Sequence, residues 1–469
     1  MYLGFDLGTT NVKALVADES GRIVGAGSAP VERFCTPDEG VEQDIEQIWE
    51  ATCKAIGQAA GRKRDAIRAV GVSSQGGALQ LVDEHDCPVG RVISWLDGRG
   101  RPFDLELVAE LGARFLAEHI GYGASAMTLG QVLRLRRVAP EMLRPPHRLG
   151  FVGDVIVGRL CGRRAHDPTS LGIALLYNPW LGRADPEILA RLGVEETQLP
   201  DLLPPTEPAG CLRPEVAERT GLRPGIPVSP AVHDQYAAAL GAGSVEPGDV
   251  NFGAGTAWVL LANTERLLRP VVDQAFVCSH LVRGIYGQML SLVTGGSAIE
   301  WAMRLLGDEW AGLARVDELA DSVPAGSDGL RYWPLLGRLE GIRLAHGPGH
   351  LVRAVVEGLA CELTRHLGLL TRAGLTPRRL SMCGSAATSR STPQIVADVA
   401  NLPVACIDTP DVSALGAAMI ASALIGKRDL LETVRRWSPP GRVVLPGPHR
   451  AVYRGVLEEY MAPLGGSIV

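Results

Sequence analysis

Two short segments, one at the start of the chain and one near its middle, share the pattern that most constrains the fold. Residues 2–5 are an apolar run that ends at Asp6 and leads into Gly8-Thr9-Thr10. Residues 249–252 lead in the same way into Gly253-Ala254-Gly255-Thr256, after which an apolar pattern resumes. A strand followed by a tight turn is expected in both places. The repetition predicts an internal duplication with a boundary at residues 241–248, where Gly and Pro gather.

The order of the other segments in the first half predicts an α/β fold. Residues 12–16 and 22–26 continue the first strand as a three-strand meander, residues 44–57 have helical spacing, and residues 70–73 form a buried strand. A mixed sheet covered by helices follows from this order. The Pro-rich stretch 200–208 is a competing boundary, but a surface loop is the better interpretation because the same pattern continues on both sides.

Composition excludes several classes of protein. A chain of 469 residues with 46% apolar and 21% charged residues can bury sizeable cores, which excludes a small module and a disordered chain. The net charge of -6 provides no general attraction for nucleic acid or anionic membranes. The nine cysteines include no CxxC pair, and the N-terminus lacks the features of a secretory signal. We therefore expect a cytoplasmic protein with reduced thiols.

The first turn carries the residue types that a phosphate and metal site needs. Gly8 lets backbone N–H groups approach phosphate oxygens, the hydroxyls of Thr9 and Thr10 add donors, and Lys13 supplies positive charge. Asp6, at the strand end, can hold Mg²⁺ directly or through water. An ordinary β-turn is the alternative. The second turn favours the phosphate site, because two such hairpins could hold one polyphosphate.

Asp234 is a candidate catalytic base. It lies in His233-Asp234-Gln235, after the strand-like residues 227–232 and before the small-residue helix expected at 236–240. At a helix N-terminus the macrodipole favours an ionised carboxylate, which a base that accepts a hydroxyl proton requires. The alternative is a carboxylate that only caps the helix.

Together these motifs resemble those of the FGGY carbohydrate kinases, a branch of the actin-like ATPase superfold, over nearly the whole chain. Residues 6–13 resemble the first phosphate motif of that family and residues 249–261 the second, and Asp234 falls at the place of the catalytic aspartate. Residues 337–342 and 350–357 are similar in every spacing to its C-terminal signature, although a packing helix is the better interpretation for most of the second part.

The resemblance implies ATP and Mg²⁺ as cofactors. Residues 382–399 resemble the adenosine motif and residues 413–418 the small-residue helix that follows it, while Glu300 is matched to the nucleotide with a structural role left open. The implied Mg²⁺ ligands are Asp6 and Asp234. The implied nucleotide residues are Asp6, Gly8, Thr9, Thr10, Asn11, Lys13, Gly255, Thr256, Gly296, Glu300, Gly384, Ser385 and Ser389.

The residues expected to bind the sugar differ from the pattern of the family. Residues 73–77 lie where xylulose kinases have Gln-Met-His and glycerol kinases have an Arg-Glu pair after Gln, and this sequence has neither. Gly76 and Gly77 stand there instead, which implies a roomier or differently filled pocket. Residues 95–99 resemble a Trp-x-Asp-x-Arg segment, which offers an apolar face and a carboxylate. Gln131 and Arg134 stand where the N-terminal signature has Lys and Trp, and the acidic loop before Gly341 is shortened. The implied substrate residues are Gln75, Gly76, Gly77, Trp95, Asp97 and Asp234.

We therefore predict two actin-like (ribonuclease H-like) α/β domains, residues 1–243 and 244–469, each a mixed sheet flanked by helices, with a cleft between them. The expected function is ATP-dependent phosphorylation of a small sugar, first a ketopentose or related polyol, with Asp234 as base. D-xylulose is expected to be a poor substrate because Gly76 and Gly77 offer its hydroxyls no partner. The alternative is a non-catalytic or self-assembling actin-like ATPase. We expect a small-molecule sugar as partner, no nucleic acid and no membrane, and leave a homodimer open.

Overall fold

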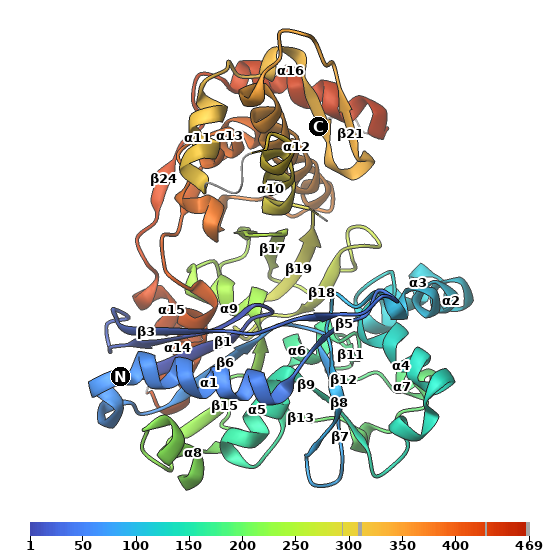
Figure 1. Ribbon diagram of the computed structural model, residues 1–469, viewed down its shortest axis with the longest axis vertical. Helices are drawn as coiled ribbons and strands as arrows, with labels where there is room; N and C mark the ends of the chain where they lie inside the picture. The colour runs from blue at the N-terminus through green and yellow to red at the C-terminus, as the bar shows by residue number, and fades with distance from the viewer. Residues whose placement is uncertain (293, 308–311, 427–428, 466–469) are drawn as a thin grey trace. The chain divides into compact units, whose positions relative to one another are not determined.

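The computed structural model describes residues 1–292, 294–307, 312–426 and 429–465, which form two compact units (Figure 1). The main stretch of the first unit ends at Val245, close to the predicted boundary, but two later segments return to it. The units are thus not two contiguous halves of the chain. The first comprises Met1–Val245, Glu265–Gly287 and Asp411–Ser438, and the second comprises Glu246–Thr264, Gln288–Pro410 and Pro439–Val469.

The first unit is built on a mixed sheet with the order β13-β10-β15-β6-β1-β2-β3, in which β14 also pairs with β15. The predicted meander is confirmed, since β1, β2 and β3 are antiparallel neighbours. The strands β6 and β15 run parallel to β1, so the three carboxyl ends meet at one edge of the sheet. The strands are β1 (Tyr2–Leu7), β2 (Asn11–Ala17), β3 (Ile23–Pro30), β6 (Val70–Ser74), β10 (Ala165–His166), β13 (Asp201–Leu202), β14 (Gly210–Cys211) and β15 (Pro227–His233).

Helices α1 (Ile45–Ala60) and α14 (Val412–Ile425) cover opposite faces of this sheet. A Cβ on Gly25 of β3 would lie 2.1 Å from Ala59 O of α1, and a Cβ on Gly4 of β1 would lie 2.1 Å from a carbonyl oxygen of α14. In the strand register Gly4 is aligned across β2 with Ala26, the neighbour of Gly25, so the two glycines point to opposite faces. Glycine thus lets both helices approach the sheet at backbone distance.

The remaining elements of the first unit form a smaller antiparallel sheet and short helices. That sheet has the order β4-β5-β8-β7-β9. After the short β13, residues 203–209 form the surface loop that the Pro-rich stretch predicted. The elements are β4 (Phe34–Cys35), β5 (Val41–Gln43), β7 (Leu79–Val82), β8 (Pro88–Ile93), β9 (Arg148–Phe151), α2 (Arg101–Leu111), α3 (Ala113–Ile120), α4 (Thr128–Val138), α5 (Val152–Cys161), α6 (Pro168–Ile173), β11 (Tyr177–Asn178), β12 (Arg183–Ala184), α7 (Pro186–Leu192), α8 (Pro214–Thr220), α9 (Asp234–Gly241), β18 (Phe276–Ser279) and α15 (Leu430–Trp437).

The second unit repeats the central topology of the first. Its strands follow the order β19-β17-β16-β22-β23-β24, with β17 antiparallel and β22 parallel to β16. A hairpin with a parallel neighbour thus recurs, which agrees with the predicted duplication. The strands are β16 (Asp249–Ala254), β17 (Trp258–Thr264), β19 (Tyr286–Ser291), β22 (Arg379–Cys383), β23 (Val404–Cys406) and β24 (Arg442–Val444), and a separate hairpin joins β20 (Arg331–Trp333) to β21 (Arg338–Glu340).

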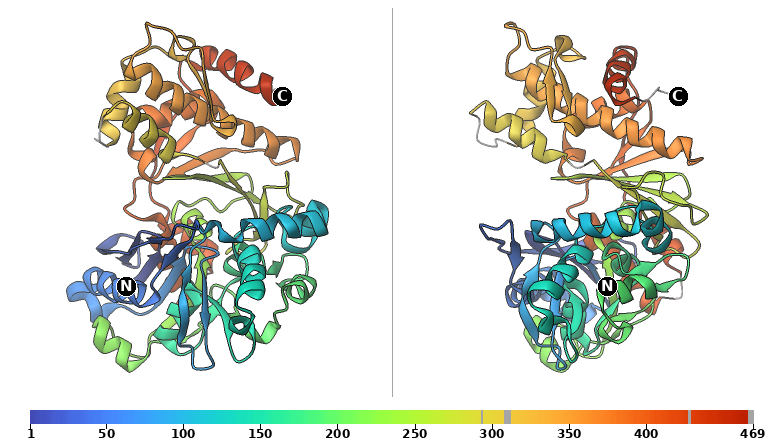
Figure 2. Two further views of the ribbon diagram at one scale, coloured as in Figure 1. Left: turned by 45° about the vertical axis from the view of Figure 1, so that its right-hand side comes forward. Right: turned by 90° about the vertical axis from the view of Figure 1, so that its right-hand side faces the viewer.

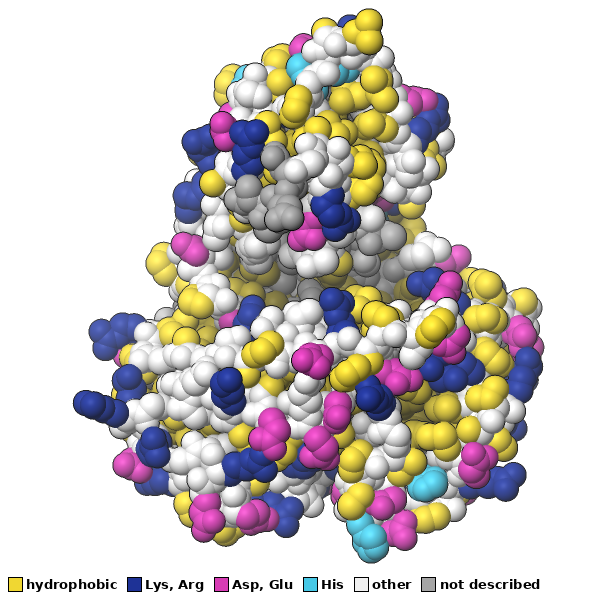
Figure 3. Space-filling view, viewed as in Figure 1, with side chains coloured by type: hydrophobic (Ala, Val, Ile, Leu, Met, Phe, Trp, Pro, Cys, Tyr) yellow, Lys and Arg dark blue, Asp and Glu magenta, His cyan; other side chains and the backbone are white. Residues whose placement is uncertain are grey.

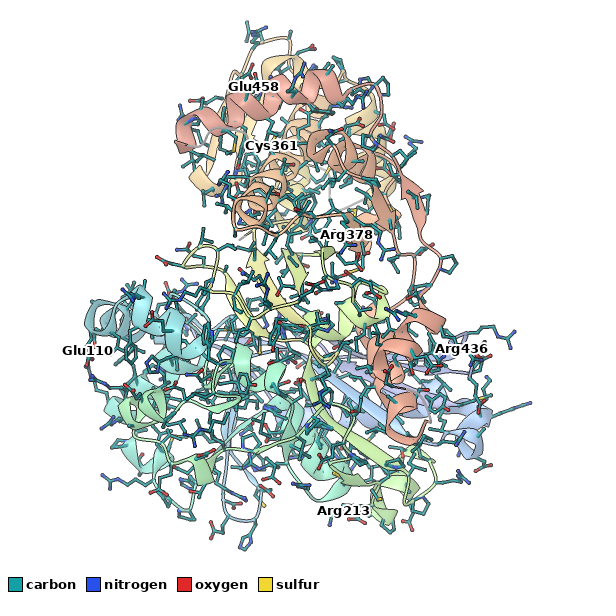
Figure 4. All side chains as sticks on the ribbon, turned by 180° about the vertical axis from the view of Figure 1, so that it is seen from behind. Glu110, Arg213, Cys361, Arg378, Arg436 and Glu458 are labelled. Atoms are coloured by element: carbon teal, nitrogen blue, oxygen red, sulfur yellow. The ribbon has the colours of Figure 1, made fainter. Side chains whose placement is uncertain are left out.

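The longest helix, α12 (Pro348–Arg372), organises the helical layer of the second unit (Figure 2). It contacts α10 (Gly296–Leu305), α11 (Leu313–Asp321), α13 (Ser391–Ala400) and α16 (Arg450–Met461). Within the C-terminal signature, Glu357 accepts hydrogen bonds from the Gly326 N–H at 2.9 Å and the Tyr453 hydroxyl at 2.9 Å. Cys361 is buried one turn further on (Figure 4). Most of residues 350–357 are buried, which agrees with the packing interpretation of this part of the signature.

The distribution of surface charge and the state of the cysteines agree with the expectations from composition. Basic and acidic side chains are interspersed on the face seen in Figure 3. All nine cysteines are free thiols. Within the described ranges, every helix is too short or too polar to cross a bilayer.

Candidate active site

The turn between β1 and β2 has a defined local geometry. The Gly8 N–H donates to Asn11 O at 3.1 Å, and a Cβ at Gly8 would lie 2.8 Å from that same oxygen, so glycine is required here. Thr9 is half-buried and Thr10 is exposed. The Asn11 side-chain amide donates to the Thr10 hydroxyl at 3.3 Å. The turn thus presents hydroxyl and amide groups outward, as its predicted role requires.

Two of the predicted sugar residues, buried Gln75 and exposed Trp95, hydrogen-bond to the Thr9 side chain of the first turn. The Thr9 hydroxyl donates to Gln75 Oε1 at 3.1 Å and accepts from Trp95 Nε1 at 3.0 Å. Gln43, at the end of β5, donates from Nε2 to Thr9 O at 3.0 Å and accepts from Gln75 Nε2 at 3.1 Å. The structure therefore brings the predicted phosphate turn and part of the predicted sugar site together. Gln43 was not predicted from the sequence because a single glutamine outside any motif gives no signal of a site.

A cluster of carboxylates lies at the edge of the sheet where β1, β6 and β15 end. Asp6 Oδ1 accepts a hydrogen bond from the Ser73 hydroxyl at 2.6 Å. Burial raises the pKa of Asp6 well above its usual value, and the nearby carboxylates of Asp411 and Asp234 raise it further. Burial also raises the pKa of Asp234, with a contribution from Asp411, while His233 opposes this shift. Three acidic side chains thus influence one another at this edge.

Asp411 is a further member of this cluster that the sequence analysis did not single out. Its Oδ2 lies 3.1 Å from Lys13 Nζ, while its Oδ1 accepts the Ala414 N–H at 2.7 Å and so caps α14. Asp before a small-residue helix is a recognisable cap pattern. The sequence did not indicate, however, that α14 packs on the first unit and delivers this carboxylate to Lys13.

Asp234 is the first residue of α9, as predicted. Its Oδ1 lies 3.1 Å from His233 Nε2. The side chain of Asp234 is 25% exposed, whereas that of His233 is 5% exposed. Burial lowers the pKa of His233. The candidate base therefore has one side in the protein and one side accessible.

The two glycines after Gln75 do not leave an open space. A Cβ on Gly76 would lie 2.5 Å from Ile173 Cγ2 and 2.8 Å from His233 Cδ2. A Cβ on Gly77, whose φ is +70°, would lie 2.9 Å from the sulfur of Met127. Met127, Ile173 and the His233 ring thus occupy the space beside the two glycines, and a contact of these glycines with a sugar stays a prediction.

Asp97 is enclosed by protein donors. Its carboxylate accepts hydrogen bonds from the Val41 N–H at 2.9 Å, the Arg99 side chain at 2.6 Å and Gln131 Nε2 at 2.9 Å. Burial acts to raise the pKa of Asp97, but the hydrogen bonds from Arg99 and the Val41 N–H outweigh it and hold the pKa below its usual value. Arg134 in turn donates to Gln131 at 2.9 Å. The two departures from the N-terminal signature thus support Asp97, and a sugar contact by Asp97, which stays a prediction, would require a donor to be displaced.

The predicted nucleotide residues of the second unit converge around its first turn. The Gly296 N–H, at the start of α10, donates to Gly255 O at 3.0 Å, and the Ser297 N–H donates to Thr256 O at 3.1 Å. Gly384 has a φ of +90°, and a Cβ there would lie 2.9 Å from the backbone of β16. The three glycines that the resemblance assigned to the nucleotide therefore share one backbone cluster.

The polar residues assigned to the nucleotide differ in how available they are. Ser389 is buried, and its hydroxyl donates to Asp317 at 2.5 Å, which is a structural use. Ser385 is exposed at the start of a short 3-10 turn, and Glu300 is half-buried on α10. Arg378, labelled in Figure 4, supports the turn before β16 through Pro247 O. Thr256 and Ser385, which are exposed, and half-buried Glu300 are the members of the second unit whose side chains are accessible.

The fold and these sites define a two-domain, actin-like α/β phosphotransferase. The sequence model of the N-terminal domain of the FGGY family of carbohydrate kinases matches residues 1–241, and that of the C-terminal domain matches residues 334–425. The chain belongs to the FGGY family of carbohydrate kinases.

Individual relatives agree with this assignment. The chain is 27% identical to a xylulose kinase of Escherichia coli (strain K12), over 90% of this chain and 89% of that protein. It is also 27% identical to an L-fuculokinase of Salmonella typhi, over 93% and 94% of the two chains. The crystal structure of a xylulose kinase from Rhodospirillum rubrum superposes with a TM-score of 0.89 at 26% identity, covering 99% of this chain and 98% of that one. The protein is therefore an ATP-dependent sugar kinase, and these relatives differ in the sugar that they are named for.

Proposed function

We propose that this kinase transfers the γ-phosphoryl group of ATP to a hydroxyl of a small open-chain sugar or polyol, with a ketopentose as the first candidate and Asp234 as the base. The observation that carries the proposal is the position of Asp234. It begins α9 beside Asp6 and Asp411, at the sheet edge that also holds the Thr9 turn. A partly exposed carboxylate there can accept the proton of a substrate hydroxyl.

The electrostatics of Asp234 support this role. Burial raises its pKa, which strengthens it as a base but also favours the protonated form. The N-terminus of α9 and the hydrogen bonding of Gln235 favour the ionised form. In our proposal these opposing effects leave a carboxylate that is ionised at neutral pH and accepts a proton readily.

We propose that each of the two glycine-threonine turns binds phosphate groups. In the second unit, the turn at Gly255 and Thr256 would face the phosphate oxygens, and the Gly296 and Ser297 N–H groups at the start of α10 hold this turn by donating to Gly255 O and Thr256 O. In the first unit, the Thr9 turn and Lys13 supply donors and charge. Lys13 is 45% exposed in its pair with Asp411, so a phosphate can reach it.

Mg²⁺ fits the carboxylates of the first unit. The pKa of Asp6 is raised by burial and by its neighbouring carboxylates, a repulsion that a bound cation would relieve. Among the described residues, no three acidic, His or Cys side chains converge tightly enough to enclose a metal. This suits Mg²⁺, which usually keeps several waters and uses one or two carboxylates with the substrate phosphates. Asp6 and Asp234 would hold it, and the ion would neutralise phosphate charge.

We propose that the substrate pocket lies beside the first turn. Gln75 and Trp95 surround the Thr9 hydroxyl, and the adjoining wall at Gly76 and Gly77 is filled by apolar Met127 and by Ile173. A sugar hydroxyl buried against that wall would lose about 1 to 3 kcal/mol, or roughly 5- to 150-fold in affinity. We therefore keep the prediction that D-xylulose is a poor substrate. A cytoplasmic location, consistent with nine free thiols, is part of the proposal.

A coupled assay of ADP release against a panel of ketoses and polyols tests the proposal. We expect release to depend on a sugar, and Asp234→Asn, which keeps the size of the side chain, to lower turnover by about 10² to 10⁴ while ATP binding and folding are retained. Turnover of this variant within a few-fold of wild type would refute the assignment of the base. ATP hydrolysis that is independent of every sugar would instead favour the alternative of an actin-like ATPase. A higher specificity constant for D-xylulose than for the other sugars would refute our view of the pocket.

A further inference from the structure

Met127 goes against two local preferences at once. Its φ of +50° and ψ of −108° fall outside the regions that residues with side chains favour, the left-handed region included. Met127 is also the N-cap of α4, a position that favours Ser, Thr, Asp, Asn or Gly, because a thioether is only a weak hydrogen-bond acceptor. Conflicts of this kind concentrate at functional sites, where a side chain is held in place for another purpose.

The Met127 side chain is directed at Gly77. A Cβ on Gly77 would lie 2.9 Å from Met127 Sδ and 3.3 Å from Met127 Cβ. Gly77 has a φ of +70°, so its backbone as well as the available space favours glycine. The two residues are complementary, because the thioether occupies the space that a side chain at position 77 would take. Met127 is half-buried, which leaves part of its side chain accessible to a ligand.

This contact lies beside the residues of the proposed site. Gly77 is two residues after Gln75, which hydrogen-bonds to the first phosphate turn. Between them, a Cβ on Gly76 would lie 2.5 Å from Ile173 Cγ2 and 2.8 Å from the ring of His233, the neighbour of the candidate base. The end of β6 therefore joins the phosphate turn and the candidate base to an apolar surface.

The chemistry of this surface determines which part of a sugar can face it. Met127 and Ile173 present carbon and sulfur atoms, which suit a methyl or methylene group. A hydroxyl pressed against them would lose its hydrogen bonds to water and gain none of equal strength. A chain that ends in a methyl group avoids this loss, whereas a chain that ends in a hydroxymethyl group does not.

We propose that Met127 is a specificity-determining residue of the sugar site, held against Gly77 by its strained backbone. The preferred substrate is an open-chain sugar or polyol that is deoxygenated at one end and places its methyl group against Met127 and Ile173. This inference rests on the proposed sugar kinase function and narrows its substrate class. The strain matters because a relaxed backbone at residue 127 would carry the thioether away from Gly77 and reopen the space.

The first test measures the preference for a methyl group. Two pairs of sugars differ by one terminal oxygen atom, namely 1-deoxy-D-xylulose with D-xylulose and 6-deoxy-L-sorbose with L-sorbose. We expect the wild-type kcat/KM to be about 5- to 150-fold higher for the deoxy member of at least one pair, which is the effect of one unpaired hydroxyl. Isothermal titration calorimetry of wild type without ATP should give the same preference in Kd, and this measurement needs no turnover.

The second test separates the proposed role of Met127 from ordinary packing. In Met127→Gly, glycine accepts both the backbone conformation and the N-cap position, so relief of strain should offset the lost contact. We expect its Tm to lie within about 2 °C of wild type or above it. The preference for the deoxy sugar should fall by about 5-fold or more.

Met142→Gly is the matched control. Met142 is half-buried in the same unit, has a negative φ, and also approaches a glycine of positive φ, since a Cβ on Gly90 would lie 3.7 Å from Met142 Cε. This variant relieves no strain, so its Tm should fall by roughly 2 to 8 °C. Its preference between the paired sugars should stay within about twofold of wild type.

The outcomes distinguish this inference from the proposed function. Sugar-dependent ADP release with no wild-type preference for either deoxy sugar, or with the same preference in Met127→Gly, would overturn the role of Met127 and leave the kinase function intact. If no sugar bound or stimulated ADP release, the proposed function and this inference would both be refuted. A fall in Tm in Met127→Gly as large as that in Met142→Gly would overturn the strain argument, because it would show that Met127 serves packing.

Discussion

Close packing between α14 and α9 should make Gly416→Ala a disruptive change, although it adds only one methyl group. A Cβ at Gly416 would lie 1.9 Å from Ala237 O and 2.7 Å from Ala237 C. Both are backbone atoms of α9, the helix that begins at Asp234. Restoring an ordinary carbon–oxygen contact would require the two helices to separate by about 1.5 Å. The side chain cannot escape by choosing another rotamer, since alanine has none.

The magnitude follows from two opposing terms. Overpacking of a well-packed contact costs about 1 to 3 kcal/mol, and the separation needed here points to the upper end. Replacing glycine by alanine inside a helix stabilises the helix by about 0.5 to 1 kcal/mol, which offsets part of this cost. The net loss of about 2 to 2.5 kcal/mol corresponds to a fall in Tm of roughly 4 to 10 °C for a unit of this size. A shift of about 1 Å at Asp234 should in addition lower kcat by about 10²-fold.

The control is Gly57→Ala in α1 of the same unit. A Cβ at Gly57 would have its nearest contact at 3.9 Å, from Thr220 O, so it fits without strain. This variant should be more stable than wild type by about 0.5 to 1 kcal/mol and should keep wild-type turnover. Thermal unfolding followed by circular dichroism and the ADP-release assay measure both quantities. If Gly416→Ala kept the wild-type Tm and turnover, the packing argument for the position of Asp234 would be refuted.

Two further changes probe the carboxylate cluster and the buried histidines. Asp411→Asn should keep the cap on the Ala414 N–H but lose the ion pair with Lys13, so we expect a loss of up to about 1 kcal/mol in stability and a raised KM for ATP. Asp411→Ala also removes the cap and should be less stable by about 1 kcal/mol more. Equal Tm values for the two variants would contradict the capping role. Burial lowers the pKa of His280 to about 3, so this ring binds a proton less readily in the folded protein than in the unfolded chain. The stability that His280 contributes at neutral pH is therefore lost as pH falls from about 6.5 toward 3. The acid-side fall in stability should therefore be shallower in His280→Asn by up to about 1.4 kcal/mol per pH unit, as urea unfolding between pH 5 and 7 would measure, and parallel curves for the variant and wild type would contradict the burial argument.

Local chemistry in the sequence was sufficient for the elements and the motifs. The apolar run before Asp6 and the Gly8 turn predict a hairpin because strand period and turn preference act over a few residues. The same reasoning placed Asp234 at the start of a helix, since a strand-like run followed by small residues leaves few alternatives. Together with the second turn at Gly255, these patterns were enough to indicate the duplicated α/β fold and the family.

What only the tertiary structure decided are the contacts between segments distant in the chain. Asp411 joins Lys13 because α14 returns to the first unit, and no local pattern reports where a helix packs. Gly76 and Gly77 suggested space, yet Met127 and Ile173 fill it, because a missing side chain leaves room only if no neighbour occupies it. Asp97 belongs to a motif, but its enclosure depends on partners brought by other elements. Residue type is a property of the sequence, whereas the availability of a side chain is a property of its neighbours.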